Sequence, residues 1–331
     1  MFQYPAAFFS FSALFIPITY KFVFSMKFGK LPSIDACTED FFRLPAVESR
    51  FCALSSEPQS TQVEVRTGGT MWTIRPWRGI VYPQKAVQRS WPEWYGKQFS
   101  SLEFNATHYR IYPPEKMAEW AAAMPEDFRF CPKFPQIISH YRRFNRCEGP
   151  TDDFIDGILA LGNRLGTSFI QLPPHYAPKH AAYLVEYLKK WPKELTLSVE
   201  FRHPEWFEES PEALALWQLM TDRGIGAVIC DTAGRRDALH MRITSPHVIV
   251  RFGGYEGHPL DDFRIRQWAQ WVDKWKNSGL KSFDFLVHEP DSVLTPQTCI
   301  RFTEHLEQVS GLSCRSPKLM DPSLPLFDAP R

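Results

Sequence analysis

The sequence has almost no excess of charge: 38 Lys and Arg residues stand against 37 Asp and Glu, a formal net charge of +1 at pH 7. This balance gives no global attraction to nucleic acid or to an anionic membrane, although a local basic patch is compatible with it. The seven cysteines are scattered and form no Cys-x-x-Cys pair. They predict neither a zinc site nor a disulfide framework, and they favour reduced thiols in the cytoplasm.

Several cofactor signatures are also missing. The Gly-rich segment after the first predicted strand, Thr67–Trp72 (TGGTMW), lacks the Gly-x-Gly-x-x-Gly spacing of a dinucleotide site. The sequence has no Walker-A lysine motif, no His-x-His and no His-Glu-x-x-His. We therefore expect no nucleotide, flavin or other cofactor, with a bound divalent metal as the alternative.

An apolar and aromatic stretch, residues 1–25, opens the chain. It has no basic residue before Lys21, and Pro5 and Pro17 would interrupt a spanning helix of about 20 residues. A hydrophilic segment begins at Met26. We predict that the start codon is placed too early and that Met26 is the first residue, with a targeting segment as the alternative. No stable membrane partner is expected.

From about Gln62 onward, short β-branched or aromatic runs alternate with helical patterns. This rhythm predicts repeated βα units and a parallel sheet. Over residues 62–312 the pattern is typical of a single (β/α)8 TIM-type barrel, and an open doubly wound sheet is the alternative. Residues 26–61 would wrap the barrel or close its floor, and residues 313–331 would form a flexible Pro-rich tail. The eight expected strands are 62–67, 100–105, 128–133, 167–172, 196–202, 225–231, 247–252 and 283–288.

The predicted helix 262–278 carries a stripe of tryptophans. Trp268, Trp271 and Trp275 recur at positions i, i+3 and i+7. This spacing places them on one face, which we expect to pack on the strands rather than to bind a cofactor.

Polar residues stand at the carboxyl ends of the predicted strands, which is where barrel enzymes place their sites. Alternation along a strand puts Glu103 and Asn105 on the side opposite Phe104. We expect these residues to converge on one pocket. The candidate catalytic residues are Glu103, Lys133, Glu200 and Asp231. The candidate substrate-binding residues are Asn105, Tyr109, His140, Arg202, His203, Arg251 and His288.

Acidic and basic members of this set nearly balance. Because buried charges are costly unless they are paired, the balance favours ion pairs that orient and tune acid and base groups. A salt-bridge network that only plugs the top of the barrel is the alternative. A metal site of Glu200, Asp231 and His288 is geometrically conceivable, but no histidine spacing supports it.

A basic segment follows the third predicted strand. Tyr141, Arg142, Arg143, Phe144 and Arg146 interleave aromatic and basic side chains. Such a segment could hold a phosphate or an extended polyanion, and a solvated loop is the alternative.

Five segments resemble the YecE-like family, domain of unknown function 72: LEFNATHYRIYPP, FCPKFPQIISHYRR, VEFRHPEWF, CDTAGRRDALHMR and VRFGGYEG. Their order and spacing match from about Val63 to Leu312. The resemblance implies a TIM-type barrel and no established reaction. Family members often begin near a MKFGK-like sequence, which favours Met26. The chain departs from the family's Gly-Thr-Ser-Gly-Trp-like turn at Thr67–Trp72 and from its Asn-rich segment at Val287–Asp291, which puts any role of that Asn in doubt.

The C-terminal tail resembles a second motif. Ser323–Phe327 (SLPLF) is similar to the Gln-Leu-x-Leu-Phe peptide with which bacterial proteins dock on the DNA sliding clamp. Leu324, Leu326 and Phe327 would insert into an apolar groove. Ser323 replaces the usual Gln and loses an amide hydrogen bond, and an inert tail is the alternative.

The leading hypothesis is a cofactor-independent enzyme, with hydrolysis favoured, that acts on a phosphate- or carboxylate-bearing small molecule or nucleic-acid fragment. Glu200 or Glu103 would be the general base or acid, and Lys133, Arg202 and Arg251 would stabilise negative charge. A second hypothesis is a non-catalytic module that binds nucleic acid or a repair partner through residues 141–146 and the tail. A third is a barrel that binds a small metabolite without turnover.

Overall fold

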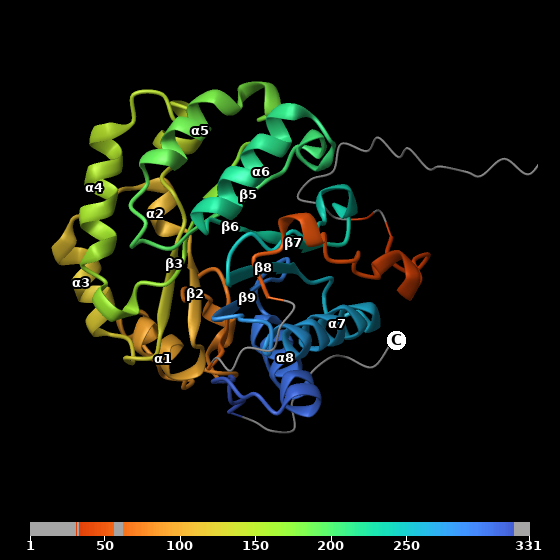
Figure 1. Ribbon diagram of the computed structural model, residues 1–331. Coiled ribbons are helices and arrows are strands. Elements are labelled where there is room, and N and C mark those ends of the chain that lie inside the picture. The colour runs from red at the N-terminus through yellow and green to blue at the C-terminus, as the bar shows by residue number, and fades with distance from the viewer. Residues whose placement is uncertain (1–30, 32, 56–61, 321–331) are drawn as a thin grey trace, which may run out of the picture.

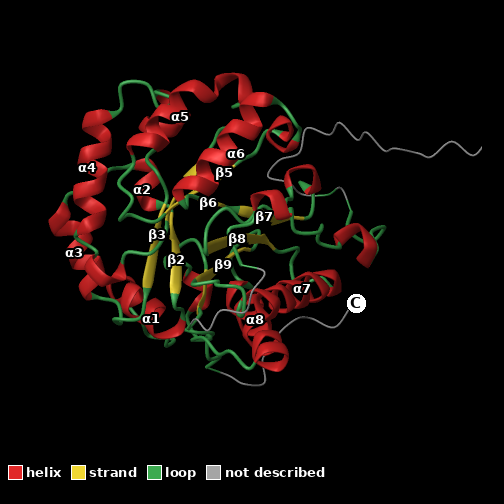
Figure 2. Cartoon of the chain, in the orientation of Figure 1, coloured by secondary structure: helices red, strands yellow, loops and turns green. Residues whose placement is uncertain are grey.

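The structure, a computed structural model, describes residues 31, 33–55 and 62–320 (Figure 1). Strands lie in the middle of the molecule and helices lie around them (Figure 2). Residues 1–30, with Met26, and residues 321–331, with Leu324, Leu326 and Phe327, lie outside the described residues. The strands are β1 (Glu64–Gly68), β2 (Ser101–Phe104), β3 (Arg129–Pro132), β4 (Ser168–Gln171), β5 (Leu197–Glu200), β6 (Gly226–Ala227), β7 (Ile229–Thr232), β8 (His247–Gly253) and β9 (Ser282–His288). The α-helices are α1 (Trp91–Gln98), α2 (Ala106–Tyr109), α3 (Pro114–Ala122), α4 (Glu148–Leu159), α5 (Ala181–Lys190), α6 (Pro211–Arg223), α7 (Pro259–Trp275) and α8 (Thr295–Ser310).

Helix α6 illustrates how local sequence sets the ends of an element. The Oγ of Ser210 accepts a hydrogen bond from the backbone N–H of Ala213 at 3.2 Å. Pro211 takes the first helical position, where a missing N–H costs nothing. Gly224 ends the helix with a φ of 65°, a left-handed conformation that glycine adopts without strain.

Every predicted strand is present, with its ends within two residues of the expected ones, and two of the strands differ in a way that affects the pairing or the site. The predicted strand 225–231 is divided at Val228, because β6 pairs with β5 whereas β7 pairs with β8. The chain therefore changes partner at this residue. The predicted strand 196–202 ends at Glu200, since a short 3-10 helix begins soon afterwards at Pro204–Phe207.

All the strand pairs are parallel, as the βα repeats predict. Their ladders form three sheets, with the orders β1-β9-β8-β7, β2-β3 and β4-β5-β6. Shorter backbone links join the sheets: the N–H of Glu103 donates to the carbonyl of Gly69 at 3.0 Å, and an isolated bridge pairs Lys133 with Phe169. An α/β fold with parallel strands is confirmed. Within the described ranges no single ladder joins all the strands, so the expected TIM barrel is not confirmed by the pairing.

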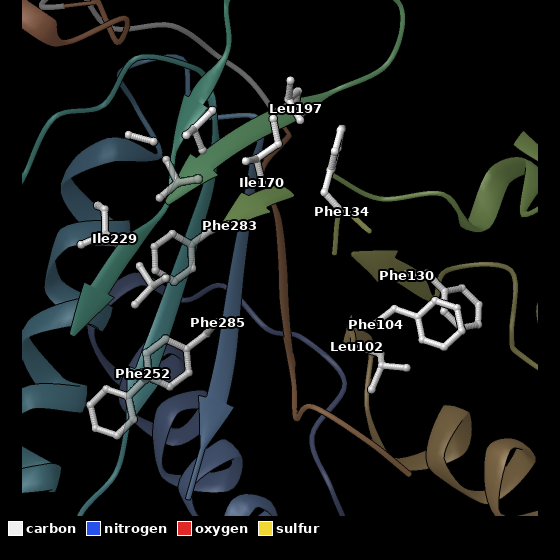
Figure 3. Packing of buried hydrophobic residues seen from close by; sticks show 14 of the residues in the cluster. Leu102, Phe104, Phe130, Phe134, Ile170, Leu197, Ile229, Phe252, Phe283 and Phe285 are labelled. Carbon is white, nitrogen blue, oxygen red and sulfur yellow. The ribbon is translucent and has the colours of Figure 1, made fainter. Parts of the chain in front are cut away.

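The strands face two separate apolar cores. One set of alternate side chains, which includes Leu102, Phe104 and Phe285, enters a main core shared with the helices (Figure 3). The opposite set enters a smaller buried cluster. Because successive side chains of a strand point to opposite sides, the position of a polar residue in this alternation decides which core it adjoins. We name the smaller one the inner cluster, and it consists of Cys131, Phe169, Val228, Ile249 and Leu286.

Helix α7 packs its tryptophan stripe inward, as predicted. Trp268 and Trp275 are buried, and Trp271 is half-buried against the same main core. Trp268 also donates its Nε1–H to Oδ2 of Asp231 at 2.8 Å. Trp268 therefore also makes a polar contact, which the i, i+3, i+7 spacing of the tryptophans did not predict.

Residues 33–55 lie alongside α6 and α7. Phe42 is fully buried, and the guanidinium carbons of Arg236 and Arg264 lie 5.4 Å and 5.3 Å from its ring centre. Further along, the N–H of Ala53 donates to the carbonyl of Ile243 at 2.6 Å. These contacts attach the segment to the outer side of the strand–helix units.

Residues 313–320 are held against α1, so the expectation of a flexible tail is wrong for this part of the chain. Arg315 donates to the carbonyl of Gly96 at 2.6 Å, and the N–H of Met320 donates to the carbonyl of Ile80 at 2.7 Å. The physical reason lies in the end of α1, whose last carbonyls have no acceptor role inside the helix and can bind a cationic side chain.

All seven cysteines are unpaired. Across the parts of the chain that the structure describes, every helix is too short or too polar to cross a membrane.

We expect the substitution Gly68→Ala to destabilise the fold. A Cβ at Gly68 would lie 1.8 Å from the carbonyl oxygen of Ser101, where β1 approaches β2. The backbone would have to shift, and the free energy of unfolding should fall by about 1–3 kcal/mol in urea denaturation. Gly149→Ala in α4 is the matched control, because a Cβ there meets no heavy atom within 4 Å. Equal stability of the two variants would contradict this close approach.

Candidate functional site

Five predicted site residues meet at the carboxyl ends of the strands. Lys133, Arg251 and His288 each lie two residues beyond a member of the inner cluster, so their side chains point to the same side as that cluster. Glu103 and Glu200 contact Arg251 directly. We name these five residues the strand-end cluster.

Arg251 lies at the centre of the strand-end cluster. Its Nε and Nη2 donate to the two carboxylate oxygens of Glu103 at 2.8 Å and 2.9 Å, a bidentate pair. Its Nη1 donates to Oε2 of Glu200 at 2.6 Å. Both carboxylate side chains are almost completely buried. One guanidinium therefore holds two buried carboxylates in fixed positions.

Glu200 has two further partners. Gln171, at the end of β4, donates its Nε2–H groups to the Glu200 carboxylate at 2.9 Å. The Nε of Arg202 lies 3.8 Å from Oε1 of Glu200, and the Arg202 side chain is half-buried. Sequence reasoning missed Gln171, although it ends a predicted strand with the same alternation as Phe169 of the inner cluster.

The carboxyl groups of the cluster are held ionised. Burial by itself would raise the pKa of Glu103, but the charge of Arg251 and the hydrogen bonds from His288 and Arg251 outweigh it and hold the pKa well below its usual range. Burial likewise opposes ionisation of Glu200, and Arg251 and Arg202 lower its pKa. Both groups are therefore poor proton acceptors near neutral pH.

Lys133 is the cation of the cluster that has no direct partner. Its side chain is buried, and no acceptor among the described residues lies within ion-pair distance of its Nζ. Burial lowers its pKa, and Arg251 adds to that effect, while Glu103 and Glu200 oppose it. The nearby carboxylates are occupied by Arg251, so the ammonium of Lys133 remains available to a ligand.

His288 forms a pair with Glu103. Its Nε2 lies 2.6 Å from Oε2 of Glu103 and 3.1 Å from Nη2 of Arg251. A guanidinium cannot accept a hydrogen bond, so the carboxylate is the partner to which Nε2–H donates. This leaves Nδ1 without a partner among the described side chains, and the His288 side chain is 31% exposed.

Two histidines lie beside Lys133. Nδ1 of His108 lies 2.7 Å from the carbonyl oxygen of Phe134, and the His108 ring lies 5.0 Å from the ring of His140. Burial lowers the pKa of His140 to about 4, and His108, Lys133 and Arg202 add to this effect. Lys133 and Arg202 therefore place positive charge next to His140. His108 was not singled out from the sequence, although it stands in the same segment as Tyr109.

Three other predicted site residues lie at the margin. Asn105 precedes α2, and its backbone carbonyl accepts from the N–H of His108 at 3.0 Å. Tyr109 is 73% exposed. His203 uses its Nδ1 to accept from the backbone N–H of Glu205 at 3.3 Å, which gives it a capping role.

Asp231 lies outside the strand-end cluster, so the expectation that it shares the pocket is wrong. Cys230, one residue earlier, has its Sγ 3.9 Å from Nη1 of Arg251, and alternation turns Asp231 to the opposite side. There Arg264 and Arg236 donate to its Oδ1 at 2.8 Å and 2.5 Å, and Trp268 donates to Oδ2. Burial would raise the pKa of Asp231, but the two arginines lower it.

The position of Asp231 also bears on the metal site of Glu200, Asp231 and His288 that was considered from the sequence. Glu200 and His288 do not meet Asp231, because the strand separates them. Within the described ranges, no group of three or more His, Cys, Asp or Glu side chains is arranged to hold a metal ion.

Glu289 directly follows His288 and is a further buried acid. Its Oε1 lies 2.5 Å from Oγ1 of Thr298, and the absent side chain of Gly254 leaves the space that it occupies. Burial raises the pKa of this carboxyl to about 7. Sequence reasoning gave Glu289 no role, since neither its burial nor its contact with α8 follows from its position in the sequence.

The fold and the cluster define an α/β protein of parallel βα units with charged side chains at its strand ends. The chain belongs to the family described as "Protein of unknown function DUF72", whose model matches residues 66–321. Two similar curated proteins carry the family name UPF0759. YecE of Escherichia coli K12 is 28% identical over 234 residues, which cover 65% of this chain and 85% of that protein. YunF of Bacillus subtilis 168 is 27% identical over 135 residues, which cover 38% of this chain and 48% of that protein.

A solved structure is similar in fold. A DUF72 family protein from Enterococcus faecalis V583 superposes with a TM-score of 0.57 at 19% sequence identity, covering 78% of this chain and 99% of that chain. At this identity the likeness shows the fold alone.

Removal of Arg251 should destabilise the protein strongly. Arg251→Met leaves two buried carboxylates without their cation, and the free energy of unfolding should fall by about 3–5 kcal/mol in urea at pH 7. Adding Glu103→Gln and Glu200→Gln to this variant removes the unpaired charges and should recover part of the loss. A single variant as stable as the wild type would show that Arg251 does not hold the carboxylates.

Glu289→Gln should stabilise the protein at high pH. The folded protein keeps the proton of Glu289 up to about pH 7, whereas an exposed Glu loses it near pH 4.5, so the stability that this group contributes falls as pH rises between these values. The variant should exceed the wild type in free energy of unfolding by up to about 3 kcal/mol at pH 8.5, and by much less at pH 5. Glu307→Gln, an exposed change on α8, should show no such trend. An advantage of Glu289→Gln that is independent of pH would contradict this assignment.

Proposed function

We propose that this chain is an enzyme that acts on a phosphate- or carboxylate-bearing substrate at the strand-end cluster, without a resident cofactor, and that the reaction is a hydrolysis. The observation that carries the proposal is the ammonium of Lys133, which ends a largely buried side chain and which no carboxylate of the described chain binds directly. A cation in such low-dielectric surroundings lacks a counter-charge in direct contact, and an anionic substrate would supply it.

We also infer that the strands close into one (β/α)8 barrel, with β6 and β7 acting as a single strand. The inner cluster supports this closure, because its members come from β3, β4, β8, β9 and the residue between β6 and β7. The backbone links from Gly69 to Glu103 and from Lys133 to Phe169 bridge two of the gaps between the ladders. The strand-end cluster would then lie at the carboxyl mouth, where barrel enzymes hold their active sites.

The charges of the site favour an anion. Two carboxylates, Glu103 and Glu200, face three cations, Arg251, Lys133 and Arg202. Arg251 already donates its hydrogen bonds to the two carboxylates, so Lys133 and the half-buried Arg202 are the cations that can bind a ligand. Together they could hold a phosphate or carboxylate and stabilise negative charge that develops on it.

The best general base is His288, in place of the glutamates that the sequence suggested. Glu103 and Glu200 have lowered pKa values, which makes them weak bases. The contact of Nε2 with Glu103 fixes the tautomer of His288 and leaves Nδ1 free to accept a proton. Burial raises the pKa of the Cys230 thiol, so a thiolate nucleophile is not favoured.

The proposed reaction then needs only water and these side chains. Nδ1 of His288 would take a proton from a water molecule as its oxygen attacks the phosphorus or the carbonyl carbon. The bond to the leaving oxygen would break, and His288 would return the proton to that oxygen. Lys133 and Arg202 would hold the anionic oxygens throughout, while Glu103 keeps the imidazole in place.

We expect the variants Lys133→Ala and His288→Gln to lose activity on a panel of phosphomonoesters, phosphodiesters and carboxylic esters. Each should reduce kcat/KM by about 10²–10⁴-fold, because one removes the charge that holds the anion and the other removes the base. The matched control is Lys97→Ala, a change at an exposed lysine of α1 that precedes the start of β2 and pairs with Glu93. It should leave kcat/KM unchanged.

Inorganic phosphate supplies a second readout. It should raise the melting temperature of the wild type and of Lys97→Ala, but not that of Lys133→Ala. Phosphate binding without turnover on any ester would favour a binding protein instead of an enzyme. If the wild type does not bind phosphate and all the variants are as active as the wild type, the proposal is wrong.

A further inference from the structure

Two tyrosines stand exposed beside the strand-end cluster. Tyr109 ends α2, and Tyr141 ends a turn of π-helix, Ile137–Tyr141. Tyr109 is 73% exposed and Tyr141 is 68% exposed, which is more than any other Phe, Tyr or Trp in the described parts of the chain. A tyrosine ring that is exposed beside a polar site offers a flat apolar face and a hydroxyl with which a ligand can make contact.

A chain of contacts connects both tyrosines to Lys133. The hydroxyl of Thr107 donates to the carbonyl of Lys133 at 2.7 Å, and His108 follows it. The ring of His108 lies 5.2 Å from that of Tyr109 and 5.0 Å from that of His140, the neighbour of Tyr141. The two tyrosines therefore flank a pair of histidines next to the anion-binding lysine.

The segment after Tyr141 carries exposed arginines in a strained backbone. Arg143, Phe144 and Arg146 have φ values of 48°, 68° and 51°, a region that side chains other than glycine seldom adopt. Phe144 is buried and contacts the rings of Tyr176 and Tyr187 at 5.9 Å and 5.3 Å. This anchor holds the segment in a conformation that leaves Arg142 and Arg143 exposed to solvent.

This rim carries positive charge. Lys133 and Arg202 act on His140. Arg142 and Arg143 extend the same sign away from the cluster, and Arg142 holds the loop by donating to the carbonyl of Arg146 at 2.6 Å. The rim therefore combines planar rings with a row of positive charges longer than one phosphate requires.

We propose that the substrate is single-stranded nucleic acid, with bases stacked on Tyr109 and Tyr141, backbone phosphates on Arg142 and Arg143, and the reacting phosphate at Lys133. The proposal rests on the function proposed above and specifies its substrate. Single strands expose the faces of their bases, whereas a duplex hides them, so stacking on two separate rings selects the single strand.

The test measures the affinity of a labelled single-stranded DNA 12-mer by fluorescence anisotropy. Tyr109→Leu and Tyr141→Leu should each weaken binding about 5- to 100-fold, because a base loses its stacking partner. The matched control Phe41→Leu changes a 45% exposed aromatic residue of the 3-10 helix Glu39–Phe42, which packs beside α7, and should have no effect. A 12-mer of abasic sites should bind more weakly than the normal 12-mer, and the tyrosine variants should not weaken its binding further.

The outcomes separate this inference from the proposed function. If phosphate protects the wild type but not Lys133→Ala, while the tyrosine variants bind the 12-mer as the wild type does, the rim does not stack bases and the substrate assignment is wrong. Equal binding of a duplex or of a single nucleoside monophosphate would also overturn the assignment to single strands. If stacking on Tyr109 and Tyr141 is observed but Lys133→Ala still binds phosphate, the inferred rim stands and the proposed reaction site fails.

Discussion

The guanidinium of Arg251 holds two carboxylates that the protein interior could not otherwise keep ionised. Glu103, Glu200 and Arg251 lie at or near the carboxyl ends of strands that belong to three different sheets, so the side chain of Arg251 connects all three sheets there. Burial penalises each carboxylate, and the short contacts with Arg251 outweigh that penalty. The position of His288 depends on the same arrangement, because its Nε2 bonds to the carboxylate that Arg251 fixes.

A second arginine–carboxylate network lies only one residue away along β7, on the other side of the strand. Cys230 adjoins Arg251, while Asp231 is bound by Arg264, Arg236 and Trp268. Because those arginines also lie over the ring of Phe42, this network fastens the N-terminal segment and α7 to the strand. The two networks use the same chemistry, but one lies at the strand ends beside the partly exposed His288 and the other is buried beneath helix α7. Only the alternation of side chains along β7 separates the two networks: Cys230 points to the candidate site, and Asp231 points to the buried network under α7.

The sequence allowed the βα repeat, the position of every strand and five members of the cluster to be predicted, because each depends on a short-range pattern. Strands with a clear polar and apolar alternation, such as that of Glu103, show which side their end residues take. The strand before Asp231 is apolar on both faces, so its pattern does not reveal which side the acid takes, and the change of partner at Val228 depends on two other strands. Gln171 follows from the same rule as Glu103, but a neutral amide near a strand end does not stand out in a sequence as a charged side chain does.

The difference between arginine and lysine explains why one cation of the cluster has no carboxylate in direct contact with it. Arg251 presents a planar fork that binds Glu103 through two parallel hydrogen bonds and still reaches Glu200 with a third. An ammonium is a point charge and cannot match that geometry, so Lys133 does not compete for the carboxylates, although their charges act on it. Burial lowers its pKa, and only the field of the two glutamates opposes the loss of its proton. An incoming anion would meet a lysine that is held near the acids without being neutralised by direct contact, which is the condition under which its charge is most effective.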